Sequence, residues 1–262
     1  KRHCKTFFAA AVESGYIQSN PFKAKALKGK KLATRRWYRM PPSEYHALVE
    51  AASSLREKVA YAIFYTAGLR MHEAFNLTWD CIDFQKSLLY VMNRDATENI
   101  PPFSIKDHEQ RRIPLPTHTV DLLTQWHTEA PESVPFILLT RERYERVKEK
   151  WQKIQESRLP WKNRYMINNV LRNFRNHVKR AGVQPIGKFT IHTLRKCCGQ
   201  NWADNLPMNV VKEFLGHSDI STTAEFYNIV DRQHEKKAAE VVQGLLDGNK
   251  SDVQMTYEGN LA

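Results

Sequence analysis

Apolar residues recur at intervals of three and four through most of the chain, which is the spacing of a buried stripe on an α-helix. Each stripe leaves a polar face opposite it, so these helices are expected to share one apolar core. The pattern predicts helices over the ranges 3–14, 41–53, 56–67, 69–77, 117–131, 141–158, 163–181, 191–205, 207–215 and 231–247, and a short one that carries Tyr227.

Segments with the alternation of a strand are few and short. They predict one strand at Leu88–Val91 and a hairpin with strands Phe103–Lys106 and Arg112–Leu115, joined by the polar turn Asp107–Gln110. Three short strands among many helices predict an α+β fold that is mainly α-helical, instead of a repeated βαβ unit.

Residues with strong capping preferences mark several helix ends. Ser43 and Thr190 stand where an N-cap is needed, and their hydroxyls can accept a hydrogen bond from the first turn. Asn205 and Gly216 stand at helix ends where left-handed backbone is common, and Gly68 separates two predicted helices. These positions therefore predict tight turns between consecutive helices.

Positive charge is concentrated in two stretches. Lys and Arg number 40 against 28 Asp and Glu, a formal net charge of +12. Residues 1–36 and 141–180 each carry a net charge of +9, so the rest of the chain sums to −6. Segregated positive charge predicts a nucleic-acid partner, bound through Arg and Lys on the polar helix faces. Composition alone leaves a solvated basic surface or affinity for anionic lipid as alternatives.

The length of 262 residues allows one or two domains with a large core. Neither a run of 18 apolar residues nor a signal-peptide pattern occurs, so the sequence predicts neither membrane insertion nor export. The chain opens with KRHCKTFF at helical spacing and without Met, which predicts that it is part of a longer protein.

The cysteines fit neither a disulfide framework nor a metal site. Cys4 and Cys81 are isolated, and the adjacent Cys197 and Cys198 would point about 100° apart on a helix. They are expected to be reduced, packed thiols of a cytoplasmic protein. The segment MHEAFN begins like a zinc-protease motif, but Asn76 stands where the second histidine is needed, so no metal is expected.

The richest chemistry lies in residues 187–230. His192 and Arg195 are three residues apart and share one face of a helix, within the first two turns, where the backbone favours an anion. His217 follows the glycine that ends the next helix, and Tyr227 lies on the short helix after it. These four side chains together are able to bind and attack a phosphate.

Two further pieces have an ordinary alternative. Arg70 and Glu73, three residues apart, form either a surface ion pair or a phosphate-binding arginine steadied by a carboxylate. Lys106 beside the predicted hairpin turn is most often a solvated lysine in such a position.

Taken together, the motifs resemble the tyrosine recombinase (phage integrase) family. They occur in the family's order between about residues 37 and 247, and each has the turn or helix that it requires. The motifs are TAGLRMHE with Arg70 and Glu73, IKDHEQRRIPL with Lys106, HTLRK with His192 and Arg195, LGHS with His217, and TTAEFY with Tyr227. The resemblance implies a catalytic domain with a small antiparallel three-stranded sheet.

The resemblance also implies a reaction, in which a DNA phosphodiester is exchanged for a 3′-phosphotyrosyl link and then rejoined to another strand. Tyr227 would be the nucleophile, with Arg70 and Arg195 on the phosphate oxygens. Lys106 would give a proton to the departing 5′ oxygen. The other expected roles are proton acceptor or phosphate ligand for His192, phosphate donor for His217 and support of the arginines for Glu73. Bond energy is kept, and no cofactor or metal is expected.

By the same resemblance, residues 1–33 are the last part of a helical core-binding domain with its linker, and 34–247 are the catalytic domain. Residues 248–262 are expected to be a disordered tail, and the basic insertion 141–158 has no assigned role. The expected partners are double-stranded DNA and further copies of the chain, as a tetramer on DNA at the bacterial nucleoid. A type IB-like topoisomerase and a non-cutting DNA-binding protein of the same fold are the alternatives.

Overall fold

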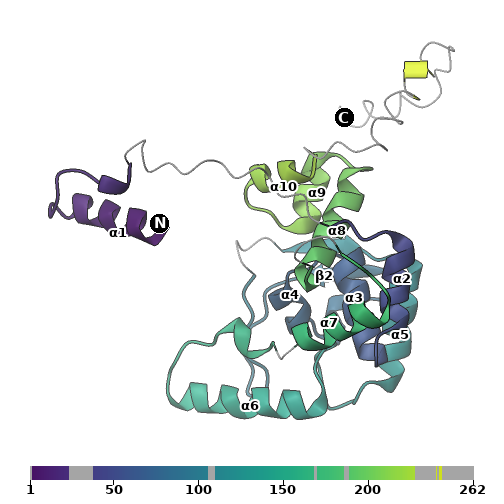
Figure 1. Ribbon diagram of the computed structural model, residues 1–262. Helices are drawn as coiled ribbons and strands as arrows, with labels where there is room; N and C mark the ends of the chain where they lie inside the picture. The colour runs from purple at the N-terminus through teal and green to yellow at the C-terminus, as the bar shows by residue number, and fades with distance from the viewer. Residues whose placement is uncertain are drawn as a thin grey trace, which may run out of the picture. The chain divides into compact units, whose positions relative to one another are not determined.

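The structure is a computed structural model, and the chain divides into two compact units, Lys1–Arg36 and Trp37–Ala262. Figure 1 shows both, and each is described here by itself. The residues that the structure describes are 2–23, 38–105, 110–167, 170–185, 189–227, 240 and 242–243.

The first unit is a short helical piece. Helix α1 (Arg2–Glu13) is followed by the 3-10 turn η1 (Pro21–Lys23). The Asn20 side-chain amide donates to the Lys5 carbonyl (2.9 Å), and Phe8 stacks on Phe22 with ring centroids 5.2 Å apart. The helix predicted at 3–14 is therefore confirmed.

The second unit is mainly helical, with a small sheet (Figure 1). Two 3-10 turns, η3 (Trp79–Cys81) and η5 (Asn163–Tyr165), accompany its helices. The helices are α2 (Pro42–Glu50), α3 (Leu55–Thr66), α4 (Met71–Asn76), α5 (Thr117–Glu129), α6 (Arg141–Glu156), α7 (Val170–Arg180), α8 (Ile191–Ala203), α9 (Met208–Leu215) and α10 (Ile220–Tyr227).

Helix α3 lies at the centre of the core and packs against α5 and α8. Every residue from Val59 to Tyr65 is buried, so no side of the helix faces solvent over that stretch. Tyr61 and Phe64 are among the largest fully buried side chains. The turn after α3, at Gly68, therefore directly follows the buried part of this helix.

The sheet is antiparallel, in the order β1 (Ile82–Asp83), β2 (Leu88–Val91), β3 (Arg111–Pro114), with Leu89 opposite Ile113. The prediction at Leu88–Val91 is confirmed, and the one at Arg112–Leu115 is displaced by one residue.

The strand predicted at Phe103–Lys106 is wrong over its described residues. Phe103 forms only an isolated bridge with Arg94, and Ile82–Asp83 takes the place of the third strand. The two prolines at 101–102 lack the N–H groups that a ladder needs, which explains why pairing does not extend. Lys106 itself, with most of the predicted turn, lies outside the described residues.

Several predicted helix ends differ from the structure. Ser43 is not a cap, because α2 begins at Pro42 and its N-cap position is Pro41. Asn205 does not adopt the left-handed conformation; α8 ends at Ala203, and the Asn205 side-chain amide donates to the Asn201 carbonyl (2.9 Å).

Three further helix predictions have different outcomes. The helix predicted at 163–181 is divided into η5 and α7. The apolar stripe predicted within 141–158 is confirmed, since Tyr144, Val147, Trp151 and Ile154 of α6 are buried. Of the helix predicted at 231–247, only residues 240, 242 and 243 are described, and the predicted tail 248–262 lies outside the described residues.

Candidate active site

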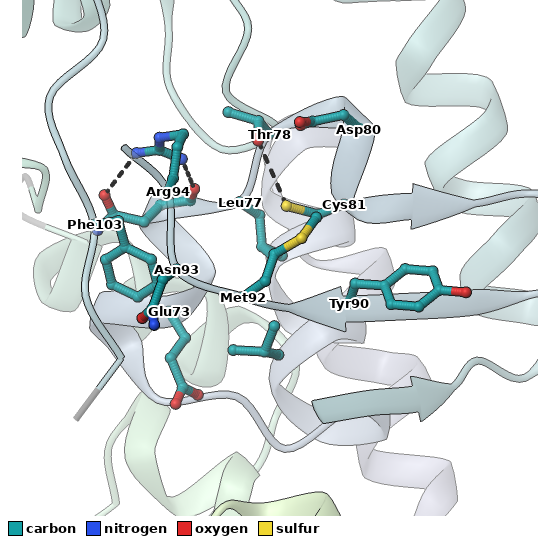
Figure 2. Close-up of a pocket in the computed structure, with 12 residues that line it drawn as sticks. Glu73, Leu77, Thr78, Asp80, Cys81, Tyr90, Met92, Asn93, Arg94 and Phe103 are labelled. Carbon is teal, nitrogen blue, oxygen red and sulfur yellow. Dashed lines mark hydrogen bonds between the residues drawn. The ribbon is translucent and has the colours of Figure 1, made fainter. Parts of the chain in front are cut away.

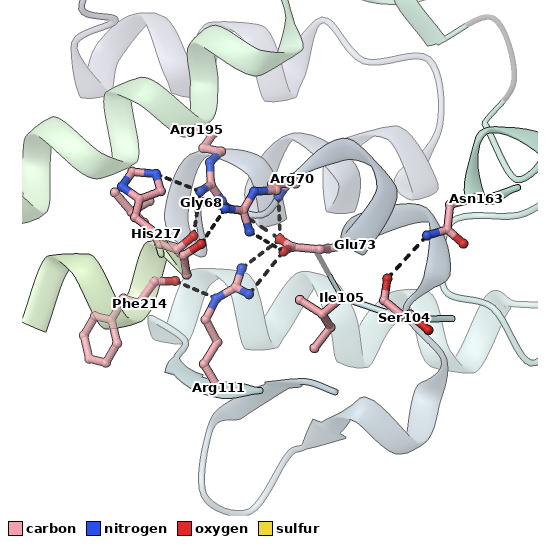
Figure 3. Close-up of polar contacts among 12 residues, drawn as sticks. Gly68, Arg70, Glu73, Ser104, Ile105, Arg111, Asn163, Arg195, Phe214 and His217 are labelled. Atoms are coloured by element: carbon pink, nitrogen blue, oxygen red, sulfur yellow. Dashed lines mark hydrogen bonds and ion pairs between the residues drawn. The ribbon is translucent and has the colours of Figure 1, made fainter. Parts of the chain in front are cut away.

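Arg70 and Glu73 form the first turn of α4. Gly68 has φ +58° and turns the chain sharply between α3 and α4, and a Cβ there would lie 3.1 Å from the Cys198 Sγ. Arg70 is the N-cap residue, and its backbone N–H donates to the Glu73 Oε2 (2.7 Å) while its Nη1 donates to the Oε1 (3.1 Å). The capping geometry therefore holds the arginine and the carboxylate together (Figure 3).

The Glu73 carboxylate is buried, with 3% of its side chain exposed, so the pair is not a surface ion pair. Its two oxygens also accept from Arg111 at 3.1 and 2.7 Å, and the Arg195 Nη1 lies 4.0 Å from the Oε2. Burial alone would raise the pKa of Glu73, but the charges and hydrogen bonds of the arginines, Arg111 first, lower it on balance. Glu73 is therefore an ionised carboxylate among three guanidinium groups.

Arg195 enters the same cluster from α8. Thr190 is the N-cap residue, as predicted, and its backbone N–H donates to the Thr193 Oγ1 (3.0 Å). The Arg195 guanidinium is buried and donates to the carbonyls of Gly68 and Leu215, the latter at 2.6 Å. Burial lowers the pKa of Arg195 to about 10, so it keeps its charge at neutral pH.

His217 completes the cluster and is neutral. Gly216 ends α9 with φ +59°, as predicted, and the next residue turns its ring toward Arg195, whose Nη2 donates to the His217 Nε2 (3.2 Å). A guanidinium is only a donor, so the ring proton is on Nδ1, 3.0 Å from the Thr223 Oγ1. Burial, followed by the charges of Arg195 and Arg70, lowers the pKa of His217 to about 4.

His192 is on the helix that carries Arg195. It is in the first turn of α8, three residues before Arg195, and its side chain is exposed where that of Arg195 is buried. Partial desolvation, followed by the charges of Arg195, Lys196 and Arg70, lowers the pKa of His192. The ring is therefore kept in its basic, neutral form close to both arginines.

Tyr227 is held elsewhere. It is the last residue of α10, as predicted, and its half-buried hydroxyl donates to the Leu206 carbonyl, in the loop between α8 and α9. Burial and the nearby Asp204 raise the pKa of Tyr227. The structure thus brings together Arg70, Glu73, Arg195 and His217, whereas the Tyr227 hydroxyl is bonded to a backbone carbonyl.

Arg111 belongs to the cluster and is missed by the sequence analysis. It is the first residue of β3, and 6% of it is exposed. The alternation of side chains along a strand could have identified it. Residues two apart on a strand face the same side, so Arg111 faces inward together with Ile113. Arg112 and Pro114, on the other side, are exposed.

A cleft lies between α4, β2 and the bridge at Arg94–Phe103, with Glu73 at one end (Figure 2). The Arg94 Nη1 donates to the Asn76 carbonyl (2.7 Å), and burial lowers the pKa of Arg94. The Ile105 amide donates to the Asn93 Oδ1 (2.8 Å). These bonds hold the chain as far as Ile105, the residue before Lys106.

Two kinds of feature do not occur among the described residues. No group of three or more His, Cys, Asp or Glu side chains there has the arrangement of a metal site. No helix in the same part of the chain is long and apolar enough to cross a membrane.

The helical fold with a small sheet, and the convergence of two arginines and a neutral histidine, define a domain able to bind a phosphodiester. The model of the phage integrase family matches residues 38–234. The chain belongs to this family.

Curated relatives of similar sequence are tyrosine recombinases. The XerC-like recombinase of Caldanaerobacter subterraneus subsp. tengcongensis is 26% identical over 265 residues, which cover 92% of this chain and 64% of that protein. XerA of Thermococcus onnurineus is 26% identical over 73% of this chain and 58% of its own length. The chain therefore spans less than two thirds of the length of both relatives.

Solved structures show the same fold. The Tn1549 transposon integrase in complex with transposon right-end DNA has a TM-score of 0.65 at 17% identity, over 91% of this chain and 76% of that chain. The XerA recombinase has a TM-score of 0.56 at 17% identity, over 88% and 71% of the two chains.

Proposed function

We propose that the chain is the catalytic part of a site-specific DNA recombinase that cuts and rejoins strands through a 3′-phosphotyrosyl intermediate. The main support for this proposal is that Arg70 and Arg195, 125 positions apart in the sequence, both approach Glu73. Arg195 is also hydrogen-bonded to His217. The relatives named above as tyrosine recombinases support the same reaction.

Arg70 and Arg195 are proposed to bind the non-bridging oxygens of one DNA phosphate. Negative charge grows on these oxygens as the phosphorus becomes five-coordinate, and a guanidinium donates two parallel hydrogen bonds to them. The bonds of Arg70 and Arg195 to Glu73 and to backbone carbonyls hold these donors in place, so little reorganisation opposes the reaction. His217 is proposed to donate to the same phosphate, which requires its Nδ1 proton to leave Thr223 or a second proton to bind at Nε2.

Two proton transfers accompany the attack. Tyr227 loses its proton as its oxygen bonds to phosphorus, and the neutral imidazole of His192 is proposed to accept that proton. The bond from phosphorus to the 5′ oxygen breaks, and Lys106 is proposed to protonate the departing oxygen. The products are a 3′-phosphotyrosyl link and a free 5′-hydroxyl, and the reverse steps rejoin a strand.

The Tyr227 hydroxyl must leave the Leu206 carbonyl before it can attack. One neutral hydrogen bond contributes only about 1 kcal/mol, so this release is a small part of the barrier. We infer that DNA binding supplies it.

The proposed partners are double-stranded DNA and further copies of the chain, four of them when two sites are paired. Residues 1–33 are proposed to be the last part of a core-binding domain with its linker, and 34–247 to be the catalytic domain. The cell's nucleoid is the corresponding place of action.

Covalent capture tests the reaction. The 262-residue chain is mixed, in excess chelator, with a pool of nicked duplexes of randomised sequence, in which the short cleaved strand diffuses away. A denaturation-resistant adduct and a free 5′-hydroxyl are expected. A strict need for Mg²⁺, or a 5′-phosphate product, would contradict the proposal and indicate a nuclease.

The captured duplex then separates the alternatives. Exchange of strands between two copies of the site is expected. Relaxation of a supercoiled plasmid without exchange would indicate a type IB-like topoisomerase, and binding without any adduct would indicate a non-cutting protein of the same fold.

A further inference from the structure

Three consecutive backbone carbonyls at the end of α9 each accept from a different arginine. Phe214 accepts from Arg111 (Figure 3), Leu215 from Arg195 and Gly216 from Arg70. Terminal carbonyls of a helix lack partners within the helix, and the helix dipole makes this end attractive to cations. The end of α9 and the Glu73 carboxylate therefore form one binding site for three guanidinium groups.

The three arginines differ in exposure. The Arg70 side chain is 22% exposed, whereas those of Arg195 and Arg111 are 4% and 1% exposed. Arg111 approaches from β3, beneath the cluster, and uses every guanidinium nitrogen on the protein. Its Nε donates to the Phe214 carbonyl (2.9 Å), and its Nη1 and Nη2 donate to the two Glu73 oxygens at 3.1 and 2.7 Å. With 1% of its side chain exposed, Arg111 is covered by protein and does not face a bound phosphate.

We propose that Arg111 is a positioning residue for the proposed DNA cleavage: it fixes the Glu73 carboxylate and the end of α9, so that Arg70, Arg195 and His217 keep one arrangement around the phosphate. This inference rests on the proposed function.

The planar fork of the guanidinium is what the position requires. One planar group bonds both carboxylate oxygens and, at its third nitrogen, the Phe214 carbonyl. A lysine ammonium is a single point donor that can neutralise Glu73 but cannot keep all three bonds in one plane. Gly216 leaves the necessary room, because a Cβ there would lie 2.8 Å from the Arg111 Nη1.

Arg111 also connects this cluster to the chain segment that carries Lys106, the proposed general acid. It follows Lys106 by five residues, and its strand β3 pairs with β2 at Val91. The same residue thus links the sheet, α4 through Glu73, and the turn that carries His217.

The test uses Arg111→Lys in the 262-residue chain, with Arg112→Lys as the matched control on the exposed face of the same strand. Single-turnover cleavage of the captured duplex is measured well below the melting temperature of each variant. We expect Arg111→Lys to cleave 10- to 100-fold more slowly, with its DNA Kd within about threefold of wild type, and Arg112→Lys to cleave at the wild-type rate. A wild-type cleavage rate for Arg111→Lys overturns the inference.

A double-mutant cycle separates positioning from a purely structural role. If Arg111 acts through Glu73, Arg111→Lys should slow cleavage by at most about threefold once Glu73→Gln is present. The same factor in both backgrounds would show that Arg111 does not act through Glu73 and would overturn the inference. If wild type forms no adduct, the proposed function fails and the inference falls with it; if wild type cleaves and the cycle is additive, only the inference fails.

Discussion

The arginine cluster and the Tyr227 segment are held in opposite ways. Arg195 and Glu73 are buried and make charged hydrogen bonds to several elements. Tyr227 is half-buried at the end of α10, and its hydroxyl has one neutral hydrogen bond, to Leu206. Charged, buried bonds are costly to break, whereas a single neutral bond is not.

The difference matches what the two parts are proposed to do. A phosphate site works best when its donors are fixed before the negative charge develops. A nucleophile must move toward phosphorus, exchange its proton and later leave, so weak attachment is an advantage. The two regions nevertheless touch, because Thr223 and Phe226 of α10 contact His217.

The largest expected effect comes from breaking the fixed region. Arg195→Lys keeps the charge but loses the fork that bonds Leu215 and His217. Cleavage is expected to slow by about 100- to 1000-fold, or roughly 3–4 kcal/mol. Arg56→Lys is the control, since Arg56 also bonds a backbone carbonyl, that of Leu138. Equal losses in both variants, measured by single-turnover cleavage, would contradict a special role for Arg195.

The sequence anticipates much of the fold for a physical reason. The stripe of α6, from Tyr144 to Ile154, repeats with the helical period, and burial follows period. The segment Phe103–Ile105 has the composition of a strand, but it forms only an isolated bridge. The two prolines before it have no N–H to donate, so hydrogen-bonded pairing with a neighbouring strand does not extend there.

The site is anticipated less evenly. The motifs identify Arg70, Arg195 and His217 as candidates, and the structure brings them together. Arg111 is missed because a charged residue is assumed to face solvent, although strand parity indicates the inward face. The three arginines that bond the successive carbonyls of residues 214–216 come from three different elements. Their meeting depends on the tertiary fold, so no short stretch of sequence predicts it. The position of Lys106 and all the catalytic roles stay predictions.

The next largest effect is the pH dependence of stability that His217 gives to the arginine cluster. His217 is neutral in the folded chain, with its pKa near 4, and has a pKa near 6.5 when unfolded. Between these values only the unfolded chain binds the proton, so the stabilisation is complete above about pH 6.5 and is lost as the pH falls toward 4. Wild type should lose roughly 3 kcal/mol more unfolding free energy than His217→Gln between about pH 7.5 and 4. Parallel losses in denaturant titrations would contradict a buried, neutral His217.

A smaller effect is expected at the end of α9. Gly216→Ala imposes φ +59° on alanine and brings its Cβ against Arg111, so we expect a loss of about 2 kcal/mol. Gly182→Ala is the matched control, because Gly182 has φ +68° and no atom within 4 Å of an added Cβ. It should lose only about 1 kcal/mol. Equal losses by thermal unfolding would show that Arg111 does not limit the room at Gly216.

The smallest effect is expected in the weakly held region. Tyr227→Phe removes the hydrogen bond to Leu206 and should lower the unfolding free energy by about 1 kcal/mol or less, with DNA binding unchanged. Denaturant titration measures it. A loss of several kcal/mol would mean that Tyr227 is part of the fixed structure and would remove the contrast between the two regions.

The central claim is that the weakly held tyrosine attacks a phosphate bound by the fixed cluster. Mass spectrometry of the covalent adduct, after digestion of protein and DNA, identifies the modified residue directly. We expect a single nucleotide on the peptide that contains Tyr227, and no such peptide from Tyr227→Phe. A nucleotide on any other residue, or an adduct that persists in Tyr227→Phe, would contradict it.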